Sequence, residues 1–158
     1  MVKIKKTWRE KINEIKEKIY VITPEWEERY GKGKILIPSA LDIEKVILKT
    51  RRGQLITNDI IRSVLAKEKK VRLTDPITVG IFLRIIAEAA EEERKTKKKK
   101  VTPYWRVLKP DGSINIKFPG GAEKQSSFLK AEGHKIEPGK GKKPPRIISY
   151  PDSIKKVL

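Results

Sequence analysis

Cysteine is absent from the 158-residue chain, and histidine and methionine each occur once. Without cysteine there can be no disulfide, no thiolate metal site and no cysteine nucleophile. The single histidine, His134, excludes a three-histidine metal site and restricts a Ser-His-Asp triad to its own surroundings. Any catalysis must therefore use lysine, tyrosine, aspartate or glutamate, and we expect neither a metal nor a cofactor.

Long apolar stretches are also missing. No segment approaches the roughly 18 consecutive apolar residues of a membrane span, and the N-terminal residues lack the apolar core of a signal peptide. These absences predict a protein that has no membrane partner and is cytoplasmic, in association with the chromosome.

Acidic residues are few relative to basic ones. The chain has 38 Lys and Arg against 20 Asp and Glu, a formal net charge of +18. Such a charge repels itself in a compact protein unless an anionic partner relieves it. Heat-adapted proteins are also rich in Lys and Glu, but their enrichment is roughly balanced in sign. The imbalance favours a nucleic acid as the partner.

Apolar residues recur at helical spacing in several segments, and the expected helices are 8–20, 41–50, 58–67, 76–94 and 122–132. Ser39, Thr57 and Asp75 are the predicted N-cap residues, and Gly133 closes the last helix. The acidic end of the helix 76–94, residues 91–93, is expected to be solvated and held by the basic run 97–100.

Two β-prone runs, 101–108 and 113–118, flank the turn sequence Lys-Pro-Asp-Gly at 109–112, which predicts a β-hairpin. Three helices followed by a hairpin are typical of a winged helix-turn-helix. The predicted fold is therefore α+β and mostly helical, with a winged helix-turn-helix core and a β-hairpin wing. Its predicted parts are an N-terminal helical arm (1–38), the winged-helix domain (39–134) and a basic C-terminal tail (135–158).

Four short motifs resemble, in order and spacing, those of the C-terminal domain of the O6-alkylguanine DNA alkyltransferase family. The family's Arg-Ala-Val-Gly recognition-helix motif corresponds to Ile-Thr-Val-Gly at 77–80, and its active-site Pro-Cys-His-Arg-Val to Pro-Tyr-Trp-Arg-Val at 103–107. Its Tyr-Ser-Gly-Gly loop corresponds to Phe-Pro-Gly-Gly at 118–121, and its Leu-x-x-Glu-Gly-His to 129–134. The resemblance spans 48–136, a little over half of the chain.

The departures from the family are as informative as the matches. The reactive cysteine falls at Tyr104, the histidine that activates it at Trp105, and the arginine that replaces an extruded base at Ile77. Alkyl transfer is therefore excluded. The chain is similar to the alkyltransferase-like proteins, in which the reactive cysteine is replaced and which bind alkylated DNA without repairing it. This resemblance implies a DNA-repair protein that binds double-stranded DNA, either damaged or abasic.

The resemblance places a lesion pocket around Tyr104, Trp105, Phe118, Gly120 and Gly121. Aromatic faces stack on unpaired bases for roughly 1–3 kcal/mol each. Aromatic residues at β positions also form cores, and for Trp105 the core and pocket roles are both open.

The residues expected to touch DNA come from the recognition helix, the wing and the basic run: Thr74, Thr78, Arg84, Arg106, Lys97, Lys98, Lys99 and Lys100. Two of them have an alternative role. Arg84 is placed to pair with Glu88, and Arg106 is a candidate for a structural contact.

Lysine offers a route to catalysis, because a desolvated lysine attacks the aldehyde of an abasic site to form a Schiff base. Lys117, beside the 118–121 loop, is the candidate nucleophile, with Lys100, Lys109 and Lys124 as competitors. Glu132 is the second catalytic candidate, since in the family it closes the hydrogen-bond network behind the nucleophile. Its alternative role is to cap the helix end.

Three functions follow from these observations. The first is a non-catalytic lesion sensor and the second is a lysine-dependent lyase acting on abasic DNA. The third, an architectural or regulatory winged-helix protein, requires only the charge and the fold, and it leaves the pocket motifs without a use.

Overall fold

The computed structural model describes residues 5–96, 98, 100–148 and 154. Its helices are α1 (Trp8–Glu14), α2 (Pro24–Tyr30), α3 (Ala40–Leu48), α4 (Asn58–Lys69), α5 (Pro76–Lys95), the 3₁₀ turn η1 (Tyr104–Arg106) and α6 (Gly121–Ala131). Its strands are β1 (Lys18–Val21), β2 (Lys34–Ile37), β3 (Ile56–Thr57), β4 (Leu73–Thr74), β5 (Val107–Leu108), β6 (Ile136–Glu137) and β7 (Arg146–Ile147). The expected mixed and mainly helical fold is confirmed.

The strands form three small sheets. β2 pairs with β1 in antiparallel fashion and with β4 in parallel, so that β1 is an edge strand. β3 pairs in parallel with β5, and β6 pairs with β7 in antiparallel fashion. The two parallel pairings join segments that are distant in sequence, while most of the core is helical.

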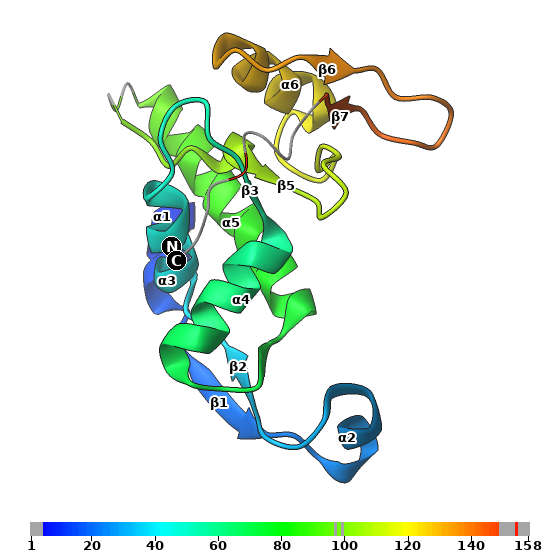
Figure 1. Cartoon of the computed structure of the whole chain (residues 1–158). Coiled ribbons are helices and arrows are strands. Elements are labelled where there is room, and N and C mark those ends of the chain that lie inside the picture. Colours follow the sequence, from blue (N-terminus) through cyan, green and yellow to red (C-terminus); the bar gives the residue numbers. More distant parts are fainter. Residues whose placement is uncertain (1–4, 97, 99, 149–153, 155–158) are drawn as a thin grey trace.

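The long helix α5 is the centre of the core. It packs against α1, α3, α4 and η1, and Figure 1 shows α4 lying across it. Leu83 and Ile86 on α5 meet Ile47 of α3 and Ile61 of α4, and all four side chains are buried. Each such side chain contributes roughly 1.5–3 kcal/mol on burial. A second cluster, which includes Leu108 and Leu129, lies beneath α6.

Two of the predicted helix starts are capped by the expected side chains. Ser39 accepts a hydrogen bond from the backbone N–H of Asp42 at 3.1 Å, and Asp75 accepts one from the N–H of Ile77 at 3.2 Å. Thr57 occupies the predicted N-cap position of α4 without a side-chain hydrogen bond to the helix. These caps explain why α3 and α5 begin within a residue of their predicted positions.

The predicted helix 8–20 is wrong in its second half. The helix ends at Glu14, and residues 18–21 form β1 instead. The reason is pairing at a distance, because Ile19 and Tyr20 lie opposite Leu36 and Ile35 of β2. The first half is as predicted, with Ile12 buried in the core.

The predicted β-hairpin wing is also wrong. The turn at 109–112 does form, with the N–H of Gly112 donating to the carbonyl of Lys109 at 2.9 Å. Val107 and Leu108, however, pair with β3, and residues 113–118 form no strand element. Ile114 and Phe118 are buried in the two apolar clusters, which draws this segment away from a regular ladder.

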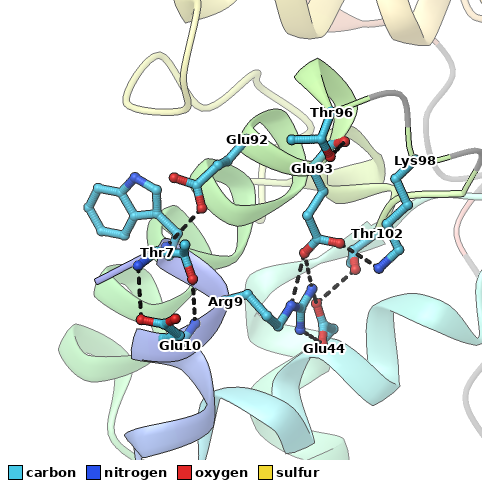
Figure 2. A network of polar contacts seen from close by, with 10 residues as sticks. Thr7, Arg9, Glu10, Glu44, Glu92, Glu93, Thr96, Lys98 and Thr102 are labelled. Atoms are coloured by element: carbon cyan, nitrogen blue, oxygen red, sulfur yellow. Dashed lines mark hydrogen bonds and ion pairs between the residues drawn. The ribbon is translucent and has the colours of Figure 1, made fainter. Parts of the chain in front are cut away.

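The acidic end of α5 is less solvated than predicted. Arg9 of α1 forms ion pairs with Glu93 at 2.7 Å and with Glu44 of α3 at 2.6 Å, and Figure 2 shows this network. Lys98 pairs with Glu93 at 2.6 Å, as the prediction of a basic partner required. Burial raises the pKa of Glu93, but the hydrogen bonds from Lys98 and Arg9 lower it more, so that its pKa lies below the ordinary value.

Candidate nucleic-acid interface

One face of α5 is solvent-exposed along the first half of the helix. Ile77, Gly80, Ile81 and Arg84 follow one another at helical spacing, and all four are exposed. The side chain of Ile77 is 74% exposed and that of Ile81 is 54% exposed. We call these four residues the α5 stripe. The α5 stripe combines apolar side chains with a cation. Neither of its isoleucines belongs to the apolar core clusters of the described residues.

Gly80 lies in the middle of this stripe and of a helix. Glycine in a helix costs roughly 0.5–1 kcal/mol relative to alanine. A Cβ atom added at Gly80 would have no atom of the described chain within 4 Å beyond its own surroundings in the helix. Packing inside the protein therefore gives no reason for a glycine here, whereas close approach of another molecule does.

The other predicted contacts of this region divide into exposed and internal groups. Arg84 is exposed, and within the described part of the chain no carboxylate forms an ion pair with it. Thr74 is buried, and its hydroxyl donates to the carbonyl of Arg62 at 2.8 Å. The hydroxyl of Thr78 donates to the carboxylate of Asp75. Arg84 is thus the predicted DNA contact of α5 whose side chain is available to solvent.

The aromatic residues of the predicted lesion pocket lie together. The Tyr104 ring contacts the rings of Phe118 and Trp105 edge-on, with centroids 5.3 Å and 5.5 Å apart. Tyr104 is 0% exposed and Phe118 is 2% exposed. Trp105 is partly buried and stacks on Phe128 at 4.3 Å. The rings fill the space between α5 and α6, and a contact between them and a lesion stays a prediction.

A buried carboxylate holds Tyr104 in place. Its hydroxyl donates to Glu91 at 2.8 Å, and Lys124 of α6 forms an ion pair with the same carboxylate at 2.5 Å. Burial and the adjacent carboxylate raise the pKa of Tyr104 above its ordinary value of 10.0. Burial raises the pKa of Glu91, yet the hydrogen bonds from Lys124 and Tyr104 lower it more, and the net direction is down. Tyr104 is therefore a neutral phenol.

Glu132 organises a second buried network on the other side of η1. It accepts hydrogen bonds from the indole N–H of Trp105 at 2.7 Å, from Nε of Arg106 at 2.9 Å and from the N–H of Gly53 at 3.1 Å. Arg106 also donates to the carbonyl of Thr50 at 2.7 Å. With 11% of its side chain exposed, the Arg106 guanidinium is directed to internal partners.

The electrostatics of this network favour an ionised Glu132. Burial raises its pKa, but the hydrogen bonds from Arg106, Trp105 and Gly53 outweigh burial and place the pKa below 4.5. His134 follows two residues later, with a buried Nε2 that has no hydrogen-bond partner in the described chain. Burial lowers the pKa of His134 below 6.5.

The glycines of the pocket motif shape the start of α6. Gly120 has φ 80°, and a Cβ there would lie 2.4 Å from Cδ of Lys124. Gly121 has φ 65° with open space around it. Lys117, the candidate nucleophile, is exposed, and its backbone N–H donates to Asn115.

Basic residues from three segments line an open cavity of about 1030 Å³ beside Trp105. We call it the cationic cavity, after Arg51, Arg52, Arg94, Lys98 and Lys100. Lys98 and Lys100 are predicted DNA contacts, whereas Lys97 and Lys99 lie outside the described residues. The three arginines are absent from the predicted interface. The adjacent pair at 51–52 was the available signal in the sequence.

The described residues include no cluster of three or more His, Cys, Asp or Glu side chains that would hold a metal ion. In the same part of the chain, no helix is long and apolar enough to cross a membrane.

Two solved structures of S. pombe proteins are similar to this chain. One is Atl1 in complex with damaged DNA containing O6-carboxymethylguanine, with a TM-score of 0.50. The other is ATL in complex with DNA, with a TM-score of 0.52. Each is 16% identical, over 75% of this chain and 94% of the other. The chain shares the fold of these alkyltransferase-like proteins. No protein-family model and no curated protein matches the sequence.

Proposed function

We propose that the protein binds duplex DNA and engages a damaged nucleotide without transferring an alkyl group, as a lesion-binding protein of DNA repair. The shared fold with proteins crystallised on DNA supports this proposal, as does the net charge of +18. In this proposal α4 and α5 act as a helix-turn-helix, with α5 as the helix that enters a groove.

The α5 stripe is the observation that carries the proposal. Proteins that bind the minor groove insert apolar side chains between base steps and use arginine to contact the groove. Ile77 and Arg84 supply these two groups from one face of the helix, two turns apart. Gly80 lies between them and leaves the helix backbone accessible to another molecule. Exposed isoleucines on both sides of a glycine with open space around it fit this use.

The chemistry of the pocket residues supports binding over catalysis. Tyr104 stands where an alkyl acceptor would be needed, and it is buried, neutral and hydrogen-bonded to Glu91. Lys124 is the lysine nearest to this tyrosine's network, and its amino group is held in an ion pair with the same carboxylate at 2.5 Å, so it is not free to attack an aldehyde. Lys117 is solvent-exposed and so lacks the apolar, water-excluding surroundings that a Schiff-base lysine requires.

Substitution of Gly80 tests the proposal, because its structural and functional effects have opposite signs. Gly80→Gln should stabilise the fold by about 0.5–1 kcal/mol, since glutamine is a better helix former and the space is open. The same side chain should weaken binding to a fluorescent duplex at least tenfold in an anisotropy titration.

Leu41→Gln, at an exposed position on α3, is the matched control and should leave duplex affinity unchanged. Equal affinities for wild type and Gly80→Gln would reject the α5 stripe as the DNA contact. A general architectural protein would bind damaged and undamaged duplexes equally well, and this comparison separates that alternative from lesion binding.

A further inference from the structure

An aromatic cleft opens where the N-terminal segment meets the start of α5. Here the arm means residues 18–37, a shorter segment than the predicted arm 1–38, and it comprises β1, α2 and β2. Figure 1 shows α2 at the opposite end of the molecule from α6. The cleft between this arm and α5 has a volume of about 520 Å³. Its walls include Tyr20, Trp26, Arg29, Tyr30 and Ile77.

The walls of this cleft are apolar surfaces that the fold leaves uncovered. Trp26 is 51% exposed and Tyr20 is 50% exposed. Trp26 and Tyr30 stack on each other with centroids 5.9 Å apart, which fixes both rings. Ile77, which belongs to the α5 stripe, also lines the cleft. The aromatic cleft is therefore continuous with the proposed DNA contact.

The arm is attached firmly to the turn that precedes α5. Arg72 donates from Nε to the carbonyl of Tyr30 at 3.0 Å, and its backbone N–H donates to the carbonyl of Lys34 at 2.9 Å. A Cβ at Gly31 would approach the Arg72 guanidinium to 3.0 Å, so the two segments are in close contact. The position of the cleft relative to Ile77 is consequently set by the fold.

The charges around the cleft favour the uncharged part of a nucleotide. Asp75 lines it, but both carboxylate oxygens already accept hydrogen bonds, from the N–H of Ile77 and the hydroxyl of Thr78. The exposed Glu25 and Glu28 on α2 repel phosphate. What remains is an aromatic cleft of base-accommodating size with one cation, Arg29, at its wall.

We propose that the aromatic cleft receives an unstacked nucleobase from the bound duplex, displaced beside Ile77 and stacked on the Trp26 and Tyr20 rings. This inference rests on the proposed function, because it assumes that α5 contacts DNA. Extruding a base costs least where pairing is already weakened, and so the cleft gives a preference for damaged or unpaired positions. It also supplies a base-binding surface outside the filled space around Tyr104.

Two fluorescent duplexes test the inference, one fully paired and one with a single-nucleotide bulge but otherwise identical. Wild type should bind the bulged duplex more tightly. Trp26→Ala should reduce this preference roughly five- to hundredfold, the range expected for loss of one base–aromatic stack, and should change affinity for the paired duplex much less. Trp26→Phe should retain most of the preference, and Leu41→Ala, outside the cleft, all of it.

The outcomes separate the inference from the proposed function. Equal wild-type affinities for the two duplexes, or a preference that survives Trp26→Ala, would overturn the cleft while leaving duplex binding intact. If wild type binds neither duplex, the proposed function fails and the inference with it. If Trp26→Ala abolishes self-association in sedimentation and leaves the bulge preference unchanged, the cleft is a protein interface and the inference is wrong.

Discussion

Replacing Glu132 with Gln removes one negative charge from the buried network beside η1 and keeps its shape. The Glu132 side chain is 6% exposed and that of its partner Arg106 is 11% exposed, so the guanidinium would be left inside the protein without a counter-ion. The new amide group also turns a donor toward either Trp105 or Arg106, both of which are donors.

The cost follows from burial and from the number of bonds lost. Breaking a buried ion pair by removing one partner destabilises proteins by about 3–5 kcal/mol. Glutamine keeps one acceptor oxygen, so we expect the low end, about 3 kcal/mol in the free energy of unfolding. For a chain of this length that corresponds to a drop of roughly 6–12 °C in Tm.

Urea unfolding followed by circular dichroism measures this change, with Glu68→Gln as the control. Glu68 forms an exposed pair with Lys49 at 4.0 Å, and its loss should have little effect. Because the folded pKa of Glu132 is lowered, its stabilisation is present above pH 4.5 and is lost as the pH falls through the folded pKa. The difference between wild type and Glu132→Gln should therefore shrink in acid. A difference below about 1 kcal/mol at pH 7 would refute the assigned role of this network.

Three further predictions concern other groups. Arg9→Met should lower the free energy of unfolding by about 2–4 kcal/mol, because Glu44 is left buried without its cation; a loss no larger than that of the exposed Lys6→Met would contradict this. Since burial lowers the folded pKa of His134, wild-type stability should fall as the pH drops below 6.5, and His134→Gln should remove that part of the decline in a melting series. After incubation with a duplex that contains O6-methylguanine, mass spectrometry should show no added methyl group, because Tyr104 is buried and neutral; a stoichiometric gain in mass would exclude the non-transferring role.

Local signals in the sequence were sufficient for the central helices. Asp75 followed by Pro76 predicts the start of α5, and the buried side chains of Leu83 and Ile86 follow from helical periodicity. The strands were not predictable in this way. β1 exists because residues 18–21 meet 34–37, and that pairing leaves no trace in its own short segment. β5 lies within the predicted β-prone run 101–108, but that run does not show that its partner is β3.

The candidate site shows the same division. The motif residues Trp105 and Arg106 both donate to Glu132, a convergence that only the structure shows, since the sequence left Arg106 between a DNA contact and a structural contact. The burial of Tyr104 depends on Glu91, a residue expected in solvent. Helical periodicity alone does not predict the exposure of Ile77, since an isoleucine near the start of an apolar helix is usually counted in its buried face, whereas the resemblance placed this residue at a DNA-facing position.

Amide chemical-shift mapping on a duplex tests the central claim most directly, because it reports which backbone groups sense the DNA. α5 separates two candidate surfaces: Ile77 and Arg94 of the cationic cavity are about 25 Å apart along the helix axis. We predict that adding duplex DNA shifts the amide resonances of residues 77–84 most strongly. Shifts confined to residues around Arg51, Arg52 and Lys100, with none along 77–84, would contradict the assignment of the α5 stripe as the DNA-binding face.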